Sequence, residues 1–145
     1  IVERFDFLRP EAELAGKLRE IQSKWGSVCL VNVVEHYVGL CARLAAELGI
    51  PGISLRSAHL CLDKSAMRQR FLKRLGPQST NRFSEVHTEA KLREFATEVG
   101  FPLVLKPTNL SASLFISLNH TQDELLHSYH RLIAEVPDYY RKAAL

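Results

Sequence analysis

The sequence predicts an α/β protein in two parts, residues 1–60 and residues 61–145. Along the first part, helical and extended patterns alternate, which is typical of a layered unit with parallel strands. The second part begins with a long basic helix, followed by the order strand, helix, strand, strand, helix. That order predicts an α+β unit with a small antiparallel sheet, because consecutive strands joined by a short loop pair as a hairpin.

The first part is predicted to contain a helix, a buried strand, a second helix and, after a short loop at residues 50–53, a brief extended segment. Pro10 can open a helix that carries an apolar stripe and ends at Trp25. Residues 27–34 are almost continuously apolar, as expected for a parallel strand that is covered on both faces. Residues 35–48 return to helical spacing, and Gly49 is the kind of residue that commonly ends a helix.

The second part contains the start and stop signals of several elements. Thr88 can cap a helix that Gly100 ends, and Thr121 with Glu124 has the spacing of a capping box. The elements expected in chain order are one basic helix at 57–75, a strand at 81–86, a helix after Thr88, a strand ending at Lys106, a strand at 113–118, and a helix at 121–135 that Pro137 ends.

Composition and charge exclude several classes of protein. The net charge of +3 is mild and the basic run matches no recognised nucleic-acid-binding fold, so we do not expect nucleic acid as a partner. The sequence has no apolar run that could cross a membrane and no signal-peptide pattern. Cys29, Cys41 and Cys61 lack CxxC spacing, which favours free thiols in the cytoplasm. Because the first residue is not Met, we expect both ends to be cuts in a longer protein, and no pattern predicts its oligomeric state.

The most informative residue is Lys106, which follows the apolar run at residues 103–105. A continuous run of this kind predicts a strand that is covered on both faces. An ammonium group is costly to desolvate without a partner, and Pro107 has no N–H with which to continue the strand pairing. Two interpretations follow: the lysine meets a fixed anion such as a nucleotide phosphate, or it extends to the strand end and is solvated there.

Two further features accompany Lys106. Lys64 follows Asp63 in the basic helix, and a loop of small residues at 109–113 comes directly after the lysine strand. Two lysines and hydroxyl groups can neutralise and hydrogen-bond a polyphosphate. The remaining basic residues of the helix are interpreted as a solvated face, with Lys64 alone at the site; they are Arg68, Arg70, Lys73 and Arg74.

In order and spacing, these motifs resemble those of the ATP-grasp superfamily, in its carboxylate–amine ligase group. The matching segments are Val28–Val33, Glu35–Val38, Leu48–Gly52, Asp63–Arg68, Leu75–Gly76, Val99–Pro107 and Asp123–Leu125. By this resemblance, residues 1–60 are the end of a pre-ATP-grasp domain, and residues 61–145 are the N-terminal half of the ATP-grasp fold.

The resemblance also implies a function and a set of site residues. Lys64 would reach the nucleotide phosphates from the helix, and Lys106 would contact the α- and β-phosphates and the adenine edge. The loop after Lys106 would fold over the phosphates, with Asn109, Ser111 and Ser113 as its polar groups. The implied reaction uses ATP with Mg²⁺, forms an acyl phosphate on a carboxylate substrate such as an amino acid, and ends with attack by an amine. Glu35 matches a glutamate that faces the substrate in some relatives.

The chain departs from the family pattern in two ways. Residues 108–114 contain no glycine, although the phosphate loop of relatives is usually glycine-rich so that backbone N–H groups can approach the oxygens. The half of the fold that closes over adenine and supplies the magnesium ligands has no counterpart after Leu145. We therefore expect the metal ligands outside this chain, no catalytic residue within it, and no complete catalysis by the fragment alone.

Two alternatives remain open. One is a binding or scaffold module that kept the ATP-grasp fold and lost the chemistry, as the glycine-free loop suggests. The other is a generic α/β domain, which predicts that Lys64 and Lys106 point to different surfaces. His127 and His130 are spaced i, i+3 on one helix, but we interpret them as surface histidines and predict no metal site.

Overall fold

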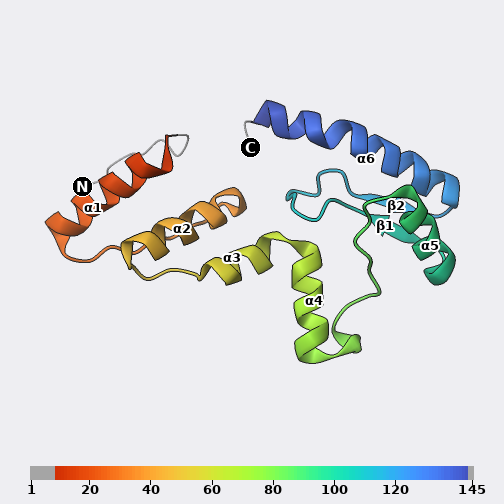
Figure 1. Cartoon of the computed structure of the whole chain (residues 1–145), viewed down its shortest axis with the longest axis horizontal. Coiled ribbons are helices and arrows are strands. Elements are labelled where there is room, and N and C mark those ends of the chain that lie inside the picture. The colour runs from red at the N-terminus through yellow and green to blue at the C-terminus, as the bar shows by residue number, and fades with distance from the viewer. Residues whose placement is uncertain (1–8, 144–145) are drawn as a thin grey trace. The chain divides into compact units, whose positions relative to one another are not determined.

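The computed structural model describes residues 9–143, which form two compact units. One unit ends at Asp63 and the other begins at Lys64. Figure 1 labels the helices and strands of both units. Each unit has its own small hydrophobic core.

The first unit is helical. Its elements are α1 (Glu11–Trp25), the 3₁₀ helix η1 (Glu35–Tyr37), α2 (Val38–Leu48) and α3 (Leu55–Leu62). The apolar stripe of α1 packs on α2 through Leu14, Ala15 and Leu44. Both predicted helices are therefore confirmed, and the left-handed backbone of Gly49, at φ 63°, ends α2.

The predicted buried strand at residues 27–34 is wrong. These residues form no regular strand, and the side chains of Val31 and Val33 are 82% and 90% exposed. A strand needs a neighbouring strand as partner for its backbone hydrogen bonds. Residues 9–63 contain no strand that could serve as that partner. The parallel α/β arrangement expected for this part is therefore not formed.

The second unit combines a hairpin with helices. Its elements are α4 (Lys64–Leu75), the 3₁₀ helix η2 (Pro77–Ser79), α5 (Glu89–Val99), β1 (Leu103–Leu105), β2 (Ser117–Asn119) and α6 (Gln122–Ala143). The predicted antiparallel hairpin is confirmed, because β1 and β2 pair with Val104 opposite Leu118. Helices α5 and α6 lie beside this small sheet (Figure 1).

The hairpin buries one face and exposes the other. Successive strand residues point to opposite faces, so Leu103 and Leu105 pack on the core of α5 and α6. Val104 and Leu118 lie on the opposite face and are 56% and 57% exposed. The expectation that the strand before Lys106 is covered on both faces is therefore wrong, because among the described residues only one face has helices packed against it.

The helix predicted at residues 57–75 is divided into α3 and α4. Asp63 has an extended backbone, with φ −104° and ψ 111°, and its N–H donates to the carbonyl of His59. The N–H of Lys64 then donates to the carbonyl of Thr108 at 2.9 Å instead of to the carbonyl of Leu60, as one continuous helix would require. This long-range hydrogen bond, which no local pattern reveals, fixes where α4 begins.

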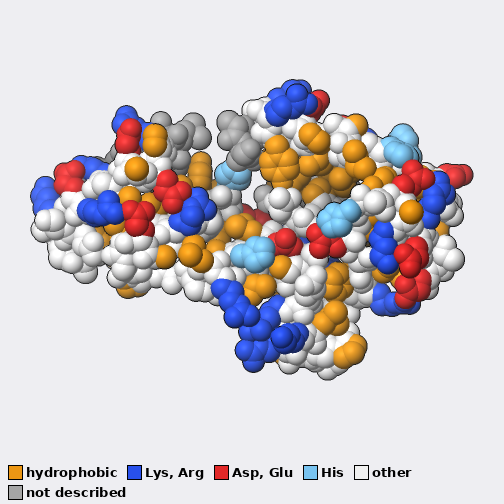
Figure 2. Space-filling model, in the orientation of Figure 1, with side chains coloured by type: hydrophobic (Ala, Val, Ile, Leu, Met, Phe, Trp, Pro, Cys, Tyr) orange, Lys and Arg blue, Asp and Glu red, His pale blue; other side chains and the backbone are white. Residues whose placement is uncertain are grey.

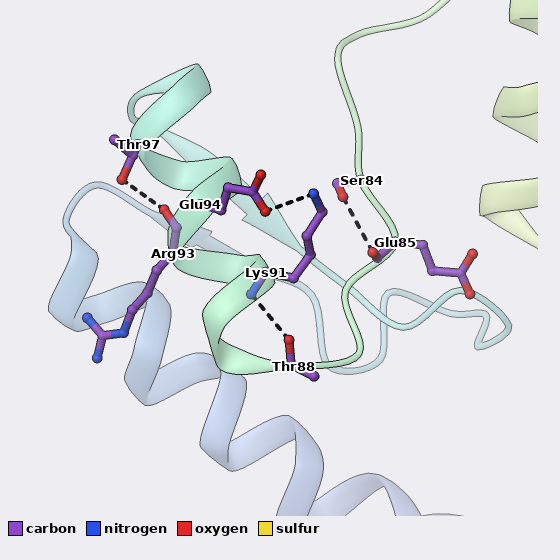
Figure 3. A network of polar contacts seen from close by, with 7 residues as sticks. All are labelled: Ser84, Glu85, Thr88, Lys91, Arg93, Glu94 and Thr97. Atoms are coloured by element: carbon purple, nitrogen blue, oxygen red, sulfur yellow. Dashed lines mark hydrogen bonds and ion pairs between the residues drawn. The ribbon is translucent and has the colours of Figure 1, made fainter.

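The strand predicted at residues 81–86 is also wrong. This segment has no regular secondary structure, because the sheet of the described chain contains β1 and β2 alone. The segment instead contacts α4 through side chains. For example, the hydroxyl of Ser65 in α4 donates to the carboxylate of Glu85 at 3.0 Å. The Glu85 side chain points away from α5 (Figure 3).

Helix caps behave as predicted, whereas Pro137 does not. Thr88 accepts a hydrogen bond from the N–H of Lys91 at 3.2 Å (Figure 3), and Thr121 accepts one from Glu124 at 3.2 Å. Helix α6 continues through Pro137 to Ala143. A proline removes one backbone donor, and here the next turn of helix is held by contacts of Tyr139 and Tyr140 with residues 109–115.

Candidate functional site

The candidate site is built around the loop at residues 107–116, which connects β1 to β2. Lys106 directly follows Leu105, the last residue of β1, and directly precedes this loop. Lys64, the first residue of α4, donates from Nζ to the carbonyl of Leu110 at 2.5 Å. Together with the hydrogen bond from Lys64 N–H to Thr108, this contact fixes the start of α4 to the loop that follows Lys106.

Lys106 lies in a surplus of positive charge. Partial burial lowers the pKa of its ammonium group, and the nearby charges of Arg68 and Lys64 lower it further. Within residues 9–143, none of these three side chains forms an ion pair with a carboxylate. A cluster of cations without a carboxylate partner attracts an anion, and a polyphosphate has the matching charge.

Arg68, which the sequence predicts on a solvated face, is partly buried. Its guanidinium donates to the hydroxyl of Thr80 at 2.8 Å and lies 5.8 Å from the ring centroid of Phe83. The spacing i, i+4 places Arg68 one turn after Lys64 on the same side of α4, and that spacing was the available signal. For Lys73 and Arg74 the solvated interpretation is confirmed, since both are exposed, and Figure 2 shows basic side chains over α4.

The polar residues of the loop have different surroundings. Asn109 accepts a hydrogen bond from the hydroxyl of Tyr140 at 2.9 Å, which attaches the loop to α6. The backbone carbonyls of Ser111 and Ser113 stabilise a turn. They accept hydrogen bonds from the backbone N–H groups of Leu114 and Ile116, respectively. In the described part of the chain, their hydroxyl groups have no hydrogen-bond partner and are available to a ligand.

Three non-glycine residues of this loop have a left-handed backbone. Ala112, Ser113 and Phe115 have φ values of 54°, 58° and 57°. For an L-residue with a Cβ, this conformation costs roughly 1–2 kcal/mol. The loop therefore adopts the backbone that glycine would favour, although residues 108–114 contain none.

Replacing Ala112 with glycine is expected to stabilise the second unit by about 0.5–1 kcal/mol. The substitution relieves the strained φ of 54°, and part of the gain is offset by the greater freedom of glycine in the unfolded chain. Amide hydrogen exchange in α5 and α6 would measure the change. Ala96→Gly within α5 is the control and should destabilise; equal losses in both variants would contradict the strain.

The remaining predicted residues belong to other elements of the chain. Glu35 is exposed at the start of η1 in the first unit, and its contact with a substrate stays a prediction. His130 lies 3.1 Å from the carboxylate of Glu89, in the contact between α5 and α6. Among residues 9–143, no three His, Cys, Asp or Glu side chains are grouped as a metal site would require.

Comparison with known proteins finds similarity to two kinds of enzyme, a ligase and a formyltransferase. It is 29% identical over 113 residues to the alanine–anticapsin ligase of Bacillus subtilis strain 168, an alignment that covers 78% of this chain and 24% of that protein. It is 34% identical over 76 residues to the formate-dependent phosphoribosylglycinamide formyltransferase of Bacteroides thetaiotaomicron, covering 52% of this chain and 19% of that protein. No protein-family model matches the chain.

A solved structure shares the fold of this chain. The L-amino acid ligase from Bacillus licheniformis superposes with a TM-score of 0.67 and 22% identity, over 89% of this chain and 30% of that one. These relatives are all ATP-grasp enzymes. The chain is similar to ATP-grasp enzymes over part of their length. The predicted resemblance is thus confirmed, together with a partial ATP-grasp-like fold that is mostly helical and has one small antiparallel sheet.

The ATP-grasp homology covers part of a longer architecture. The chain spans 24% of the length of the curated ligases it matches. The assignment of its first unit to a pre-ATP-grasp domain and of its second to half of the ATP-grasp fold stays a prediction.

Proposed function

We propose that the second unit binds the polyphosphate of ATP, as the nucleotide-binding part of an ATP-dependent carboxylate–amine ligase. The observation that carries the proposal is the convergence of Lys64 and Lys106 on one loop, with Lys64 Nζ 2.5 Å from the carbonyl of Leu110. The generic α/β interpretation expected these lysines on different surfaces. The charge of Lys64 contributes to the lowered pKa of Lys106, which supports one shared surface over that interpretation.

Each group of the site has a distinct task in this proposal. Lys64 and Lys106 neutralise phosphate oxygens as compact point charges. The hydroxyls of Ser111 and Ser113 donate to the same oxygens, while Asn109 keeps the loop attached to α6 through Tyr140. These contacts position and stabilise a phosphoryl group, which is the main contribution of a protein to phosphoryl transfer.

The proposed reaction joins a carboxylate to an amine in two steps. A carboxylate oxygen attacks the γ-phosphorus of ATP, ADP leaves, and an acyl phosphate forms. The amine then attacks the acyl carbon, phosphate leaves with the bonding electrons, and the nitrogen loses a proton as the amide forms. The names of the relatives, an alanine–anticapsin ligase and an L-amino acid ligase, support amino acids as substrates, with Glu35 as a candidate contact.

Magnesium fits this site only as a complex with the bound nucleotide. The ion prefers oxygen ligands, and the described residues bring lysine and arginine to the loop rather than a group of carboxylates. Mg²⁺ would supply charge neutralisation on the phosphates, and its protein ligands are expected outside this chain. We therefore propose that this chain binds the nucleotide and does not complete catalysis alone.

Removing the Lys64 charge tests the proposal. We expect Lys64→Ala to weaken binding of Mg·ATP by roughly tenfold or more, because a charge-assisted contact is worth about 1.5–3 kcal/mol. Isothermal titration of the 145-residue chain with Mg·ATP would measure the affinity. Lys91→Ala on α5, where Lys91 pairs with Glu94, removes the same charge at another place and should leave the affinity unchanged. Equal affinities for both variants would reject Lys64 as a ligand.

A non-catalytic binding module is the second candidate. The observation that favours it is the strained, glycine-free loop, where Cβ atoms at Ala112 and Ser113 limit how closely backbone N–H groups approach a phosphate. Amino-acid-dependent release of ADP by the full-length protein would exclude this candidate.

The cellular location is part of the proposal. Cys29, Cys41 and Cys61 are free thiols, which fits a reducing compartment, so we propose the cytoplasm. No helix in the described part of the chain is long and apolar enough to span a membrane.

A further inference from the structure

The anchoring of Arg68 is more specific than a solvated helix face requires. Its guanidinium donates to Thr80 at 2.8 Å and lies over the ring of Phe83. Thr80 and Phe83 follow η2, so groups outside α4 hold the Arg68 side chain. An exposed arginine would ordinarily keep its rotamer freedom, and two such contacts remove much of it.

The anchored guanidinium belongs to the same neighbourhood as the two lysines. Arg68 lies one helical turn after Lys64. The backbone N–H of Lys64 donates to Thr108 and its Nζ donates to Leu110, and both acceptors belong to the loop that follows Lys106. The effect of the Arg68 charge on the ammonium of Lys106 agrees with this placement, because Arg68 lowers the pKa of that group more than Lys64 does.

We propose that Arg68 is a third cationic ligand of the polyphosphate, held in position by Thr80 and Phe83. The inference rests on the proposed nucleotide site and extends it from two binding cations to three. A guanidinium suits this task because its planar fork keeps further N–H donors for phosphate oxygens while one of them is bonded to Thr80. The recognised chemistry is the phosphate chain, so inorganic triphosphate should show the same dependence on Arg68 as ATP.

Charge-matched variants of α4 test this role. Arg68→Gln is expected to weaken binding of Mg·ATP and of inorganic triphosphate by about tenfold each, as measured by isothermal titration. The control is Arg74→Gln, which removes the same charge from an exposed position in the last turn of α4 and should leave both affinities within about twofold.

A second variant distinguishes a loss of phosphate binding from a folding defect in Arg68→Gln. Thr80→Val keeps the Arg68 charge but removes the hydroxyl that accepts from it, and it should weaken both ligands about threefold. Amide exchange of α5 and α6 should match the unaltered chain in both variants. This readout reports on the core of the unit and not on phosphate binding.

The outcomes separate the two proposals. If Lys64→Ala weakens binding while Arg68→Gln and Arg74→Gln behave alike, Arg68 is not a ligand and the nucleotide site stands. If the loss in Arg68→Gln comes with faster exchange throughout α5 and α6 and Thr80→Val binds normally, Arg68 is structural and the inference fails. If the unaltered chain binds neither ATP nor inorganic triphosphate, both proposals fail.

Discussion

Replacing Lys106 with methionine is expected to lower the affinity for Mg·ATP by roughly 10- to 100-fold without lowering the stability of the second unit. The loss of affinity follows from removing one charge of the cluster at the loop. The retained stability follows from the surroundings of Lys106, since burial, Arg68 and Lys64 all disfavour its charged form. A methionine keeps the length and apolar stem of the side chain without that charge.

The lowered pKa of Lys106 also sets the sign of the pH dependence. Its value in the folded chain lies below the ordinary 10.5, so at neutral pH the charged lysine costs stability, and that cost fades as the pH rises towards 10.5. Bound phosphate favours the charged form. The affinity for ATP should therefore fall as the pH rises through the lowered pKa of Lys106, and this fall should be absent in Lys106→Met.

Titration with Mg·ATP and thermal unfolding, applied to the same samples, would check both halves of this prediction. Lys142→Met on the exposed end of α6 is the matched control and should change neither quantity. A Lys106→Met variant that binds ATP as tightly as the unaltered chain would remove Lys106 from the site. A variant that loses stability and affinity together would show that Lys106 supports the fold instead.

Replacing Leu125 with alanine should have the largest effect on stability, a loss of about 2–4 kcal/mol in the second unit. Leu125 is 2% exposed and belongs to the core of Leu92, Ala96 and Tyr129 that joins α5 to α6. Truncation removes buried methyl groups and leaves a cavity that two helices and a two-stranded sheet can only partly close. Since this core also supports Leu103 and Leu105 of β1, the position of Lys106 depends on it.

Amide hydrogen exchange of α5, α6 and the hairpin would measure that loss, because it reports opening of this unit separately from the other. Ile133→Ala is the control on the same helix. Its side chain is 51% exposed, so truncation should cost less than about 0.5 kcal/mol. Similar losses for both variants would mean that α6 is not packed through Leu125.

Sequence reasoning succeeded where the determining interactions are local. The caps at Thr88 and Thr121 and the stop at Gly49 depend on neighbouring residues alone, and the structure confirms all three. The hairpin was predicted because its strands are close in sequence. The resemblance of ordered motifs predicted the ATP-grasp homology, which the comparisons confirm.

Sequence reasoning failed where an element depends on a distant partner. Residues 27–34 have the composition of a buried strand but no strand beside them in the described unit. Helix α4 begins at Lys64 because of a hydrogen bond to Thr108, and α6 passes Pro137 because Tyr139 and Tyr140 contact residues 109–115. Arg68 was missed for the same reason, since Thr80 and Phe83 become its neighbours only in the folded chain.

In the proposed site, Lys64 and Lys106 bind one polyphosphate. Nitrogen-15 NMR of the lysine ammonium groups during a titration with Mg·ATP observes both side chains at once, with Lys64→Ala and Lys106→Met supplying the assignments. We expect the signals of Lys64 and Lys106 to shift with one shared midpoint while the signal of Lys142 does not move. Movement of one lysine without the other, or separate midpoints, would contradict it.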